Sequence, residues 1–361
     1  MKIVIIGPIP PPINGCSYAN FILCNNLKKA GYKYKTINTS TSVISSKQGN
    51  SFSFKKAFSF ISIYFSIYKL IGAKKVYFTP GQTFFGIVKY APFILLCILL
   101  RKPYVIHVHG NYLGKQYQLL SGMKKKIFKY LISKTSAGIV LSESLRSNFD
   151  QLLPVSKVFV VENFVEDSIF DYVKNKTKPT AKMKILYLSN LMREKGVLEL
   201  LDALLKIKKM GIEFEAIFAG AIENEIALEV HDKMETLGET CKYVGVIQGN
   251  KKNDYLWQSN VFVLPTYYKM EGQPISILEA LATGNIIVTT KQGGIPDIIK
   301  SENGLFVEPR SSESIVNTLT TINSNFQETL KTISNKNIKY ANLNFTEQKF
   351  TQKILSVLNT I

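Results

Sequence analysis

The sequence predicts an α/β protein with two doubly wound domains, each a parallel sheet wrapped by helices. Short apolar runs alternate with longer segments of helical spacing, which is the pattern of a parallel sheet with crossover helices. This alternation restarts once, near residue 183, and 361 residues are enough for two domains that each bury a core. The composition, 46% hydrophobic and 20% charged, is that of a globular protein rather than a disordered or fibrous one.

The first domain is assigned to residues 1–172. It opens with the apolar strand "KIVIIG", a proline-rich loop and the helical segment "CSYANFILCNNLKKAG", whose last glycine is a stop signal. The most apolar run, residues 87–100, contains Lys89 and Pro92 and is shorter than the roughly 20 residues of a membrane span, so a buried or interfacial helix is expected there. Further strands are expected at 75–79, 103–108, 137–142 and 157–161.

Residues 173–182 lack apolar periodicity and are expected to form a linker, and the second domain is assigned to residues 183–340. A C-terminal helix within 341–361 could pack on either domain, including back on the first. In doubly wound sheets ligands bind beyond the carboxyl ends of the strands, so the expected site lies in a cleft between the domains. The strands expected in the second domain lie in "MKILYLS", "FEAIFAG", "KYVGV", "NVFVLP" and "NIIVTT".

Charge is distributed unevenly along the chain. The whole chain has a net charge of +19. Residues 1–142 contain 20 Lys and Arg and no Asp or Glu, so the excess of positive charge is concentrated in this part. Such asymmetry indicates a nucleic acid, an anionic membrane surface or an acidic substrate, unless the source proteome is simply rich in lysine. The four cysteines lie far apart without metal-type spacing, which favours a reduced cytosolic compartment.

Two motifs of the first domain could carry chemistry. In "GPIPPPINGCS", Asn14 and Gly15 let the backbone approach a ligand at the start of a helix, where amides favour phosphate; the alternative is the Asn-Gly turn of a hairpin. In "HVHG", His107 and His109 share one face of a strand end and could hydrogen-bond a polar ligand. A satisfied structural histidine is the alternative, and a metal site would need a third ligand that the neighbouring sequence does not offer.

Two motifs of the second domain show the same strand, loop and helix order. "LSNLMREKGVLELL" places Arg193 and Lys195 beside a helix start, where cations are unfavourable unless an anion such as a diphosphate is bound. In "EGQPISILEALATGN", Glu271 lies in the loop, Glu279 lies more than one turn inside the following helix, and Pro274 suits its first turn. The two carboxylates could hold hydroxyls at separate places along an extended ligand. Solvated loop charges and ordinary helix glutamates remain the alternatives.

The order of these motifs resembles the fourth family of glycosyltransferases, which are retaining, nucleotide-sugar-dependent enzymes of GT-B fold with two Rossmann-like domains facing a cleft. The resemblance implies that Gly15 approaches the donor phosphates and that His109 contacts the transferred sugar. It implies that Lys195 binds the diphosphate, Glu271 the sugar hydroxyls and Glu279 the ribose. Backbone contacts to the donor are implied for Gly272, Gln273, Pro274 and Ile275. The motifs that carry the resemblance are "GPIPPPING", "HVHG", "SNLMREKG", "PTYYKMEGQPISILEALATGN", "TTKQGGIPDII" and "NGLFVEP".

The chain departs from the family at Asn190, which fills the position where the family usually has arginine, five residues before Lys195. Arg193 could compensate within the donor site, or donor affinity could be lower. No D-x-D motif occurs, so the leaving charge is expected to meet Lys195, Arg193 and helix amides, with no metal and no cofactor besides the donor itself. The resemblance implies that the leaving diphosphate takes the acceptor's proton, which makes a dedicated protein base unnecessary.

The expected function is transfer of a sugar from a UDP- or GDP-linked donor to a glycan or lipid-linked acceptor, in assembly of cell-surface polysaccharide or lipopolysaccharide. A basic binding protein for nucleic acid or another anionic polymer and a GT-B-like sugar-nucleotide epimerase are the alternatives. The expected location is the cytoplasm, peripheral at the inner face of the cytoplasmic membrane. Two lysine-bearing apolar segments, 54–72 and 122–132, are expected to lie on an anionic leaflet.

Overall fold

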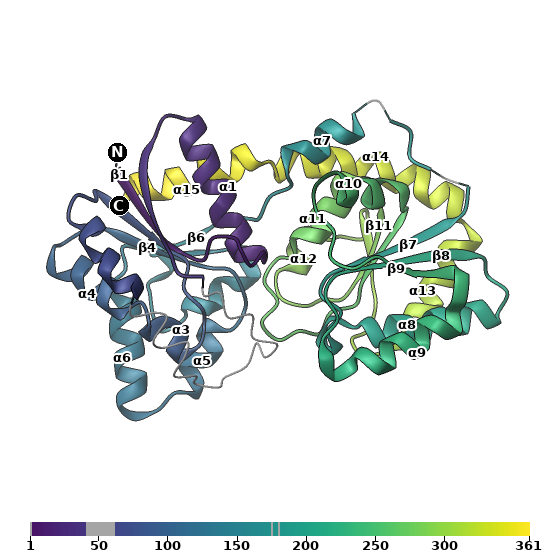
Figure 1. Cartoon of the computed structure of the whole chain (residues 1–361), viewed down its shortest axis with the longest axis horizontal. Helices are drawn as coiled ribbons and strands as arrows, with labels where there is room; N and C mark the ends of the chain where they lie inside the picture. Colours follow the sequence, from purple (N-terminus) through teal and green to yellow (C-terminus); the bar gives the residue numbers. More distant parts are fainter. Residues whose placement is uncertain (1, 41–61, 175, 180) are drawn as a thin grey trace. The chain divides into compact units, whose positions relative to one another are not determined.

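The computed structural model describes residues 2–40, 62–174, 176–179 and 181–361. The chain divides into two compact units, one made of Met1–Asn163 with Glu347–Ile361 and the other of Phe164–Thr346. Figure 1 shows a parallel sheet in each unit with helices on both of its faces. Among the described residues no helix is both long and apolar enough to cross a membrane.

The first unit contains a sheet of order β2-β1-β3-β4-β5-β6, in which every described pairing is parallel. Helix α1 and the C-terminal helix α15 pack together on one face, and α3 to α6 cover the other face (Figure 1). The elements of this unit are β1 (Lys2–Gly7), α1 (Gly15–Lys29), β2 (Lys33–Asn38), η1 (Phe65–Leu70), β3 (Lys75–Phe78), α3 (Phe84–Val88), α4 (Ala91–Leu99), β4 (Tyr104–Val108), α5 (Leu113–Leu119), α6 (Gly122–Ser133), β5 (Ala137–Val140), η2 (Glu143–Phe149), η3 (Val155–Lys157), β6 (Val158–Val160) and α15 (Glu347–Thr360).

The second unit repeats this plan with the parallel order β12-β11-β10-β7-β8-β9. Its elements are α7 (Asp167–Val173), β7 (Met183–Leu188), η4 (Arg193–Lys195), α8 (Val197–Lys209), β8 (Phe214–Ala219), η5 (Asn224–Ile226), α9 (Ala227–Leu237), η6 (Gly238–Thr240), β9 (Cys241–Tyr243), α10 (Gly249–Gln258), β10 (Val261–Leu264), α11 (Ile275–Ala282), β11 (Ile286–Thr289), α12 (Ile295–Ile298), β12 (Gly304–Phe306), α13 (Ser312–Ser324) and α14 (Phe326–Asn344).

The strand orders locate the expected ligand positions. In the first sheet the order reverses between β1 and β3, and in the second it reverses between β7 and β10. Ligands of doubly wound sheets bind beyond the carboxyl ends of the strands at such reversals. Ligands are therefore expected at the loops after β1 and β3 in the first unit, and at those after β7 and β10 in the second.

The chain crosses between units next to residue 163, earlier than the expected boundary at 172, and again next to residue 346. Helix α7 belongs to the second unit because it packs against α10 and α11. Residues 173–182, expected as a linker, therefore lie inside the second unit, where Lys178 is buried and donates from Nζ to the Leu256 carbonyl. Helix α15 packs on α1, which places the C-terminal helix on the first unit.

Candidate active site

In the second unit, the loop after β7 brings Lys195 next to the loop after β10. Gly196 ends the 3₁₀ turn Arg193–Lys195 with φ of 76°, a left-handed conformation that favours glycine. A Cβ at this position would lie 2.3 Å from the Pro265 carbonyl oxygen, so the two loops touch backbone to backbone. This close approach fixes where the side chain of Lys195 starts.

Lys195 and Glu271 form a direct ion pair in this region. Lys195 Nζ lies 2.7 Å from Glu271 Oε2, and the Thr266 hydroxyl donates to the same oxygen at 2.8 Å. The two charged side chains are only 14% and 7% exposed, so the pair is largely shielded from water. The Tyr268 ring lies 5.2 Å from Lys195 Nζ, within cation–π range. Sequence reasoning gave the two charged residues separate ligands and missed both their pairing and the roles of Thr266 and Tyr268.

The backbone around Glu271 is held by the loop after β11. A Cβ on Gly293, whose φ is 56°, would lie 2.2 Å from the Glu271 carbonyl oxygen, and the Gly294 amide donates to the Gly272 carbonyl at 2.7 Å. Helix α11 starts immediately afterwards, with Pro274 as its N-cap residue. The predicted backbone contacts at Gly272, Gln273, Pro274 and Ile275 thus lie at a helix start, where the helix dipole favours an anion. Their role in donor binding stays a prediction.

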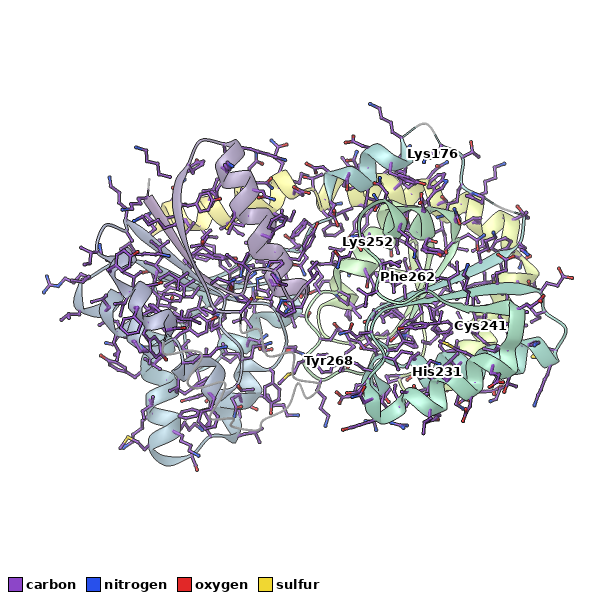
Figure 2. All side chains as sticks on the ribbon, in the orientation of Figure 1. Lys176, His231, Cys241, Lys252, Phe262 and Tyr268 are labelled. Atoms are coloured by element: carbon purple, nitrogen blue, oxygen red, sulfur yellow. The ribbon has the colours of Figure 1, made fainter. Side chains whose placement is uncertain are left out.

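Glu279 lies inside α11 and is 3% exposed. Its Oε1 accepts from Lys252 Nζ of α10 at 2.6 Å, and Lys252 also contacts Glu166 at the start of α7. Burial raises the pKa of Glu279, whereas Lys252 acts in the opposite direction. Figure 2 labels Lys252 on α10 and Tyr268 in the loop after β10. No motif singled out Lys252 or Glu166 in the sequence.

Arg193 and Asn190 do not join the Lys195–Glu271 pair. The Arg193 guanidinium lies 3.2 Å from Glu229 of α9 and is 57% exposed. Asn190 is exposed, and its carbonyl accepts from the Tyr187 hydroxyl at 3.1 Å. The structure therefore shows neither residue replacing the arginine that the resemblance leads one to expect, and their roles in donor binding stay predictions.

In the first unit, the loop after β1 ends in a well-formed helix start. Asn14 caps α1 and forms a capping box with Ser17, and Gly15 is the first residue of the helix. A helix follows the Asn-Gly pair, so the hairpin alternative is excluded. Asn20 of the same helix donates to the Thr79 hydroxyl after β3 at 2.7 Å, which joins the two loops at the reversal of the strand order.

His107 and His109 lie on one face at the end of β4, as the strand period predicts, with ring centroids 4.1 Å apart. Tyr77 Oη lies 2.6 Å from His107 Nδ1. Within the described part of the chain, His107 Nε2 and both His109 ring nitrogens are buried without a hydrogen-bond partner. Burial lowers the pKa of both rings, that of His109 to about 4. A neutral imidazole with unpaired nitrogens can serve a polar ligand.

The match to a known protein family lies within the second unit. Residues 168–340 match the family described as "Glycosyl transferases group 1". The Bacillus subtilis glycosyltransferase TuaC, named for teichuronic acid biosynthesis, is 26% identical over 225 residues, covering 60% of this chain and 54% of TuaC. The Erwinia amylovora glycosyltransferase AmsK, named for amylovoran biosynthesis, is 27% identical over 151 residues, covering 41% of this chain and 37% of AmsK. The chain spans about half the length of the curated relatives it matches.

Among solved structures, Anabaena Alr3699/HepE in complex with UDP aligns with a TM-score of 0.75 at 17% identity, covering 100% of both chains. Sucrose-phosphate synthase from Thermosynechococcus elongatus aligns with a TM-score of 0.75 at 16% identity, covering 99% of this chain and 98% of that one. At such identities the likeness concerns the fold alone. The predicted GT-B fold with two doubly wound α/β units is confirmed.

Proposed function

We propose that this protein transfers a sugar from a nucleotide-sugar donor to a glycan or lipid-linked acceptor. The proposal is supported by the match of residues 168–340 to the family described as "Glycosyl transferases group 1". The observation that carries this proposal is the shielded Lys195–Glu271 pair beside the start of α11, at the reversal of the second sheet. Names of relatives such as TuaC and AmsK support a place in polysaccharide assembly. The proposed donor is UDP- or GDP-linked.

In the proposed reaction, the bond between the anomeric carbon and the diphosphate oxygen breaks, and a bond to the acceptor oxygen forms on the same face. The acceptor's proton passes to the leaving diphosphate, so atoms and charges balance without a protein base. Lys195 and the first amides of α11 stabilise the charge that develops on the diphosphate, because such groups are already oriented before the reaction. Retention at the anomeric carbon is part of the proposal.

Glu271 is proposed to hold sugar hydroxyls rather than to act as a nucleophile. Its Oε2 already faces Lys195 and the Thr266 hydroxyl, and both contacts stabilise a carboxylate that accepts hydrogen bonds. Glu279 is proposed to hold the ribose. In the first unit, His109 is proposed to contact the transferred sugar as a neutral imidazole, and Gly15 to lie near the donor phosphates.

The test is a panel of UDP- and GDP-linked sugars, scored by thermal stabilisation and by release of nucleoside diphosphate. One donor should stabilise the protein and release its diphosphate when an acceptor is added, and a chelator should leave the rate unchanged. Stabilisation by nucleic acid alone would instead favour a basic binding protein. Conversion of the donor to an epimer, without acceptor, would favour an epimerase. Loss of activity with a chelator and recovery with a divalent ion would show that a metal takes part.

An anionic membrane is proposed as the partner surface of the first unit. Several large apolar side chains in or directly after η1, α4 and α6 are exposed, and α4 packs against both of the other two elements. A hollow of about 540 Å³ between η1 and α4 has Lys102 on its wall. The first eight residues of the predicted segment 54–72 lie outside the described residues. The exposed apolar residues are Phe65, Tyr68, Ile71, Leu95, Leu99, Leu100, Met123, Ile127 and Tyr130.

A further inference from the structure

Lys252 joins two carboxylates, one inside α11 and one at the residue that precedes α7. Its Nζ lies 2.6 Å from Glu279 Oε1 on α11 and 2.5 Å from Glu166 Oε1 at the start of α7. The Lys252, Glu279 and Glu166 side chains are 13%, 4% and 18% exposed, respectively, so this cluster is largely removed from water. A buried carboxylate needs such a partner, because burial strongly disfavours an isolated charge.

The cluster keeps a capacity to accept hydrogen bonds. Two carboxylates face one ammonium group, which leaves one formal negative charge. Lys252 donates to the Oε1 atom of Glu279, and the two oxygens of an ionised carboxylate can accept about four hydrogen bonds, so this contact uses only part of that capacity. A carboxylate oxygen accepts hydrogen bonds from hydroxyl groups, and a ribose offers two adjacent hydroxyls.

We propose that Lys252, held in place by Glu166, is a positioning residue that keeps the Glu279 carboxylate ionised and oriented toward the ribose hydroxyls of the donor. The inference rests on the proposed function, since the ribose contact of Glu279 belongs to it. Lys252 does not itself touch the donor in this arrangement. It acts through Glu279, and Glu166 acts through Lys252.

The electrostatic setting supports this role. Burial raises the pKa of Glu279, and Lys252 is the cation that opposes this shift. Burial alone would lower the pKa of Lys252, but Glu279 and Glu166 outweigh it and raise the pKa, so the amine stays charged. Besides α7, the elements that pack against α11 are α14, β10 and β11, and their buried residues are uncharged. These residues include Leu330, Ser334, Asn337 and Ala341 of α14 and all residues of β10 and β11. Removing Lys252 therefore raises the pKa of Glu279 further.

A purely structural role would tie α7, α10 and α11 together without any effect specific to ribose. The two roles separate when binding is measured with two probes, since inorganic pyrophosphate occupies a diphosphate site but has no ribose. The variants are Lys252→Met, which removes the charge, and Lys252→Arg, which keeps it. Lys251→Met is the matched control, because Lys251 is the exposed neighbour on the same helix.

Calorimetry of the full chain with UDP, GDP and pyrophosphate at pH 6, 7 and 8 is the test. Lys252→Met should weaken the better-bound nucleoside diphosphate by about 10-fold or more at pH 7, as expected for a hydrogen bond to a charged group. The loss should be larger at pH 6 than at pH 8, because the raised pKa of Glu279 leaves more of it protonated at low pH. Pyrophosphate affinity should stay unchanged, Lys252→Arg should restore most of the loss, and Lys251→Met should bind like the wild type.

If Lys252→Met lost as much affinity for pyrophosphate as for the nucleoside diphosphate, the positioning role would be overturned, and the purely structural role would be favoured. An unchanged affinity of Lys252→Met for the nucleoside diphosphate would also overturn it, while leaving the proposed function intact. A wild-type protein that binds pyrophosphate but neither UDP nor GDP would overturn the proposed function, and the ribose role would fall with it.

Discussion

Glu271 and Glu279 have different partners, so their variants should fail in different ways. Glu279→Gln should weaken binding of both the nucleotide sugar and the bare nucleoside diphosphate, since both carry the ribose, by about 0.5–3 kcal/mol. Glu271→Gln should spare diphosphate binding, because it removes an anion from beside Lys195, but should lower turnover. Calorimetry and initial rates check this. Equal weakening of diphosphate binding by the two variants would contradict the assignment.

Lys195 should matter more than Arg193. The Lys195 ammonium group is shielded beside Glu271, whereas Arg193 pairs with Glu229 at an exposed position where an ion pair contributes about 0–1 kcal/mol. Lys195→Ala should therefore reduce kcat/KM far more than Arg193→Ala, measured as diphosphate release at fixed acceptor. A larger loss for Arg193→Ala would mean that Arg193 turns toward the donor and replaces the missing arginine.

His109 gives the first unit a pH-dependent stability. The folded protein holds this ring neutral down to a pKa of about 4, whereas in the unfolded chain it binds a proton near pH 6.5. Protonation therefore favours the unfolded state, and stability should fall as pH drops from about 6.5 to 4. His109→Gln should show a smaller fall in melting temperature over this range than the wild type. If the melting temperatures of the two proteins fell equally with pH, the result would contradict the burial of a neutral His109 ring.

The sequence predicted several residues of the candidate site but not how their side chains pair. Lys195 and Glu271 were identified from their loops, yet they are 76 positions apart, and only the fold shows that their side chains meet. Lys252 and Glu166 could not be found, because a lysine on a helix and a glutamate in a loop carry no signal until burial brings them together. Arg193 was expected near the diphosphate, but the structure pairs it with Glu229 because α9 lies within reach.

At the scale of elements, the turn before α8 depends on Gly196. Gly196 and Gly211 have the same φ of 76°. A Cβ added at Gly196 would collide with the backbone of Pro265, whereas a Cβ added at Gly211 would have no atom within 4 Å. Gly211→Ala should cost about 1–2 kcal/mol from the left-handed conformation alone. Gly196→Ala should lower the melting temperature further and also reduce diphosphate binding, because it pushes the Lys195 loop away from Pro265. Equal effects on melting temperature would show that the loop contact contributes nothing.

The central strands were predictable from the sequence because they are continuous apolar runs, buried on both faces. The strands β2 and β12 were not predicted as strands. The first, "KYKTIN", has a single buried residue among six, and the second is three residues long. Both are edge strands, paired on one side within the described sheets, so their sequences carry little of the apolar signal that marks a strand.

For the molecule as a whole, the sequence predicted the fold better than it predicted the boundary between the two units. The restart of the strand and helix alternation predicted two sheets, and both are present. The boundary could not be placed from periodicity, because α7 and the polar stretch after it belong to the second unit through packing alone. Periodicity likewise predicted that α15 is an amphipathic helix, but it could not predict that α15 packs on α1.

The basic first unit should bind reversibly to anionic membranes. Helix α6 buries Phe128, Leu131 and Ile132 against the core, yet it also exposes Met123 and Ile127. The segment is therefore partly an ordinary core-facing helix, and its outer face offers both apolar side chains and lysines. Each lysine near an anionic leaflet contributes about 1 kcal/mol, so a few suffice for reversible attachment.

Cosedimentation with vesicles checks this surface. Binding should require anionic lipid and fall with added salt, since the Debye length shrinks to about 3 Å at 1 M. Changing Lys124, Lys125 and Lys126 to Glu should weaken binding, whereas changing Lys331, Lys336 and Lys339 of α14 to Glu alters net charge equally on the second unit and should matter less. Equal losses for both triple variants would mean that net charge alone drives attachment. Equal binding to neutral vesicles, or none to either kind, would remove the membrane as a partner and favour an acceptor free in solution.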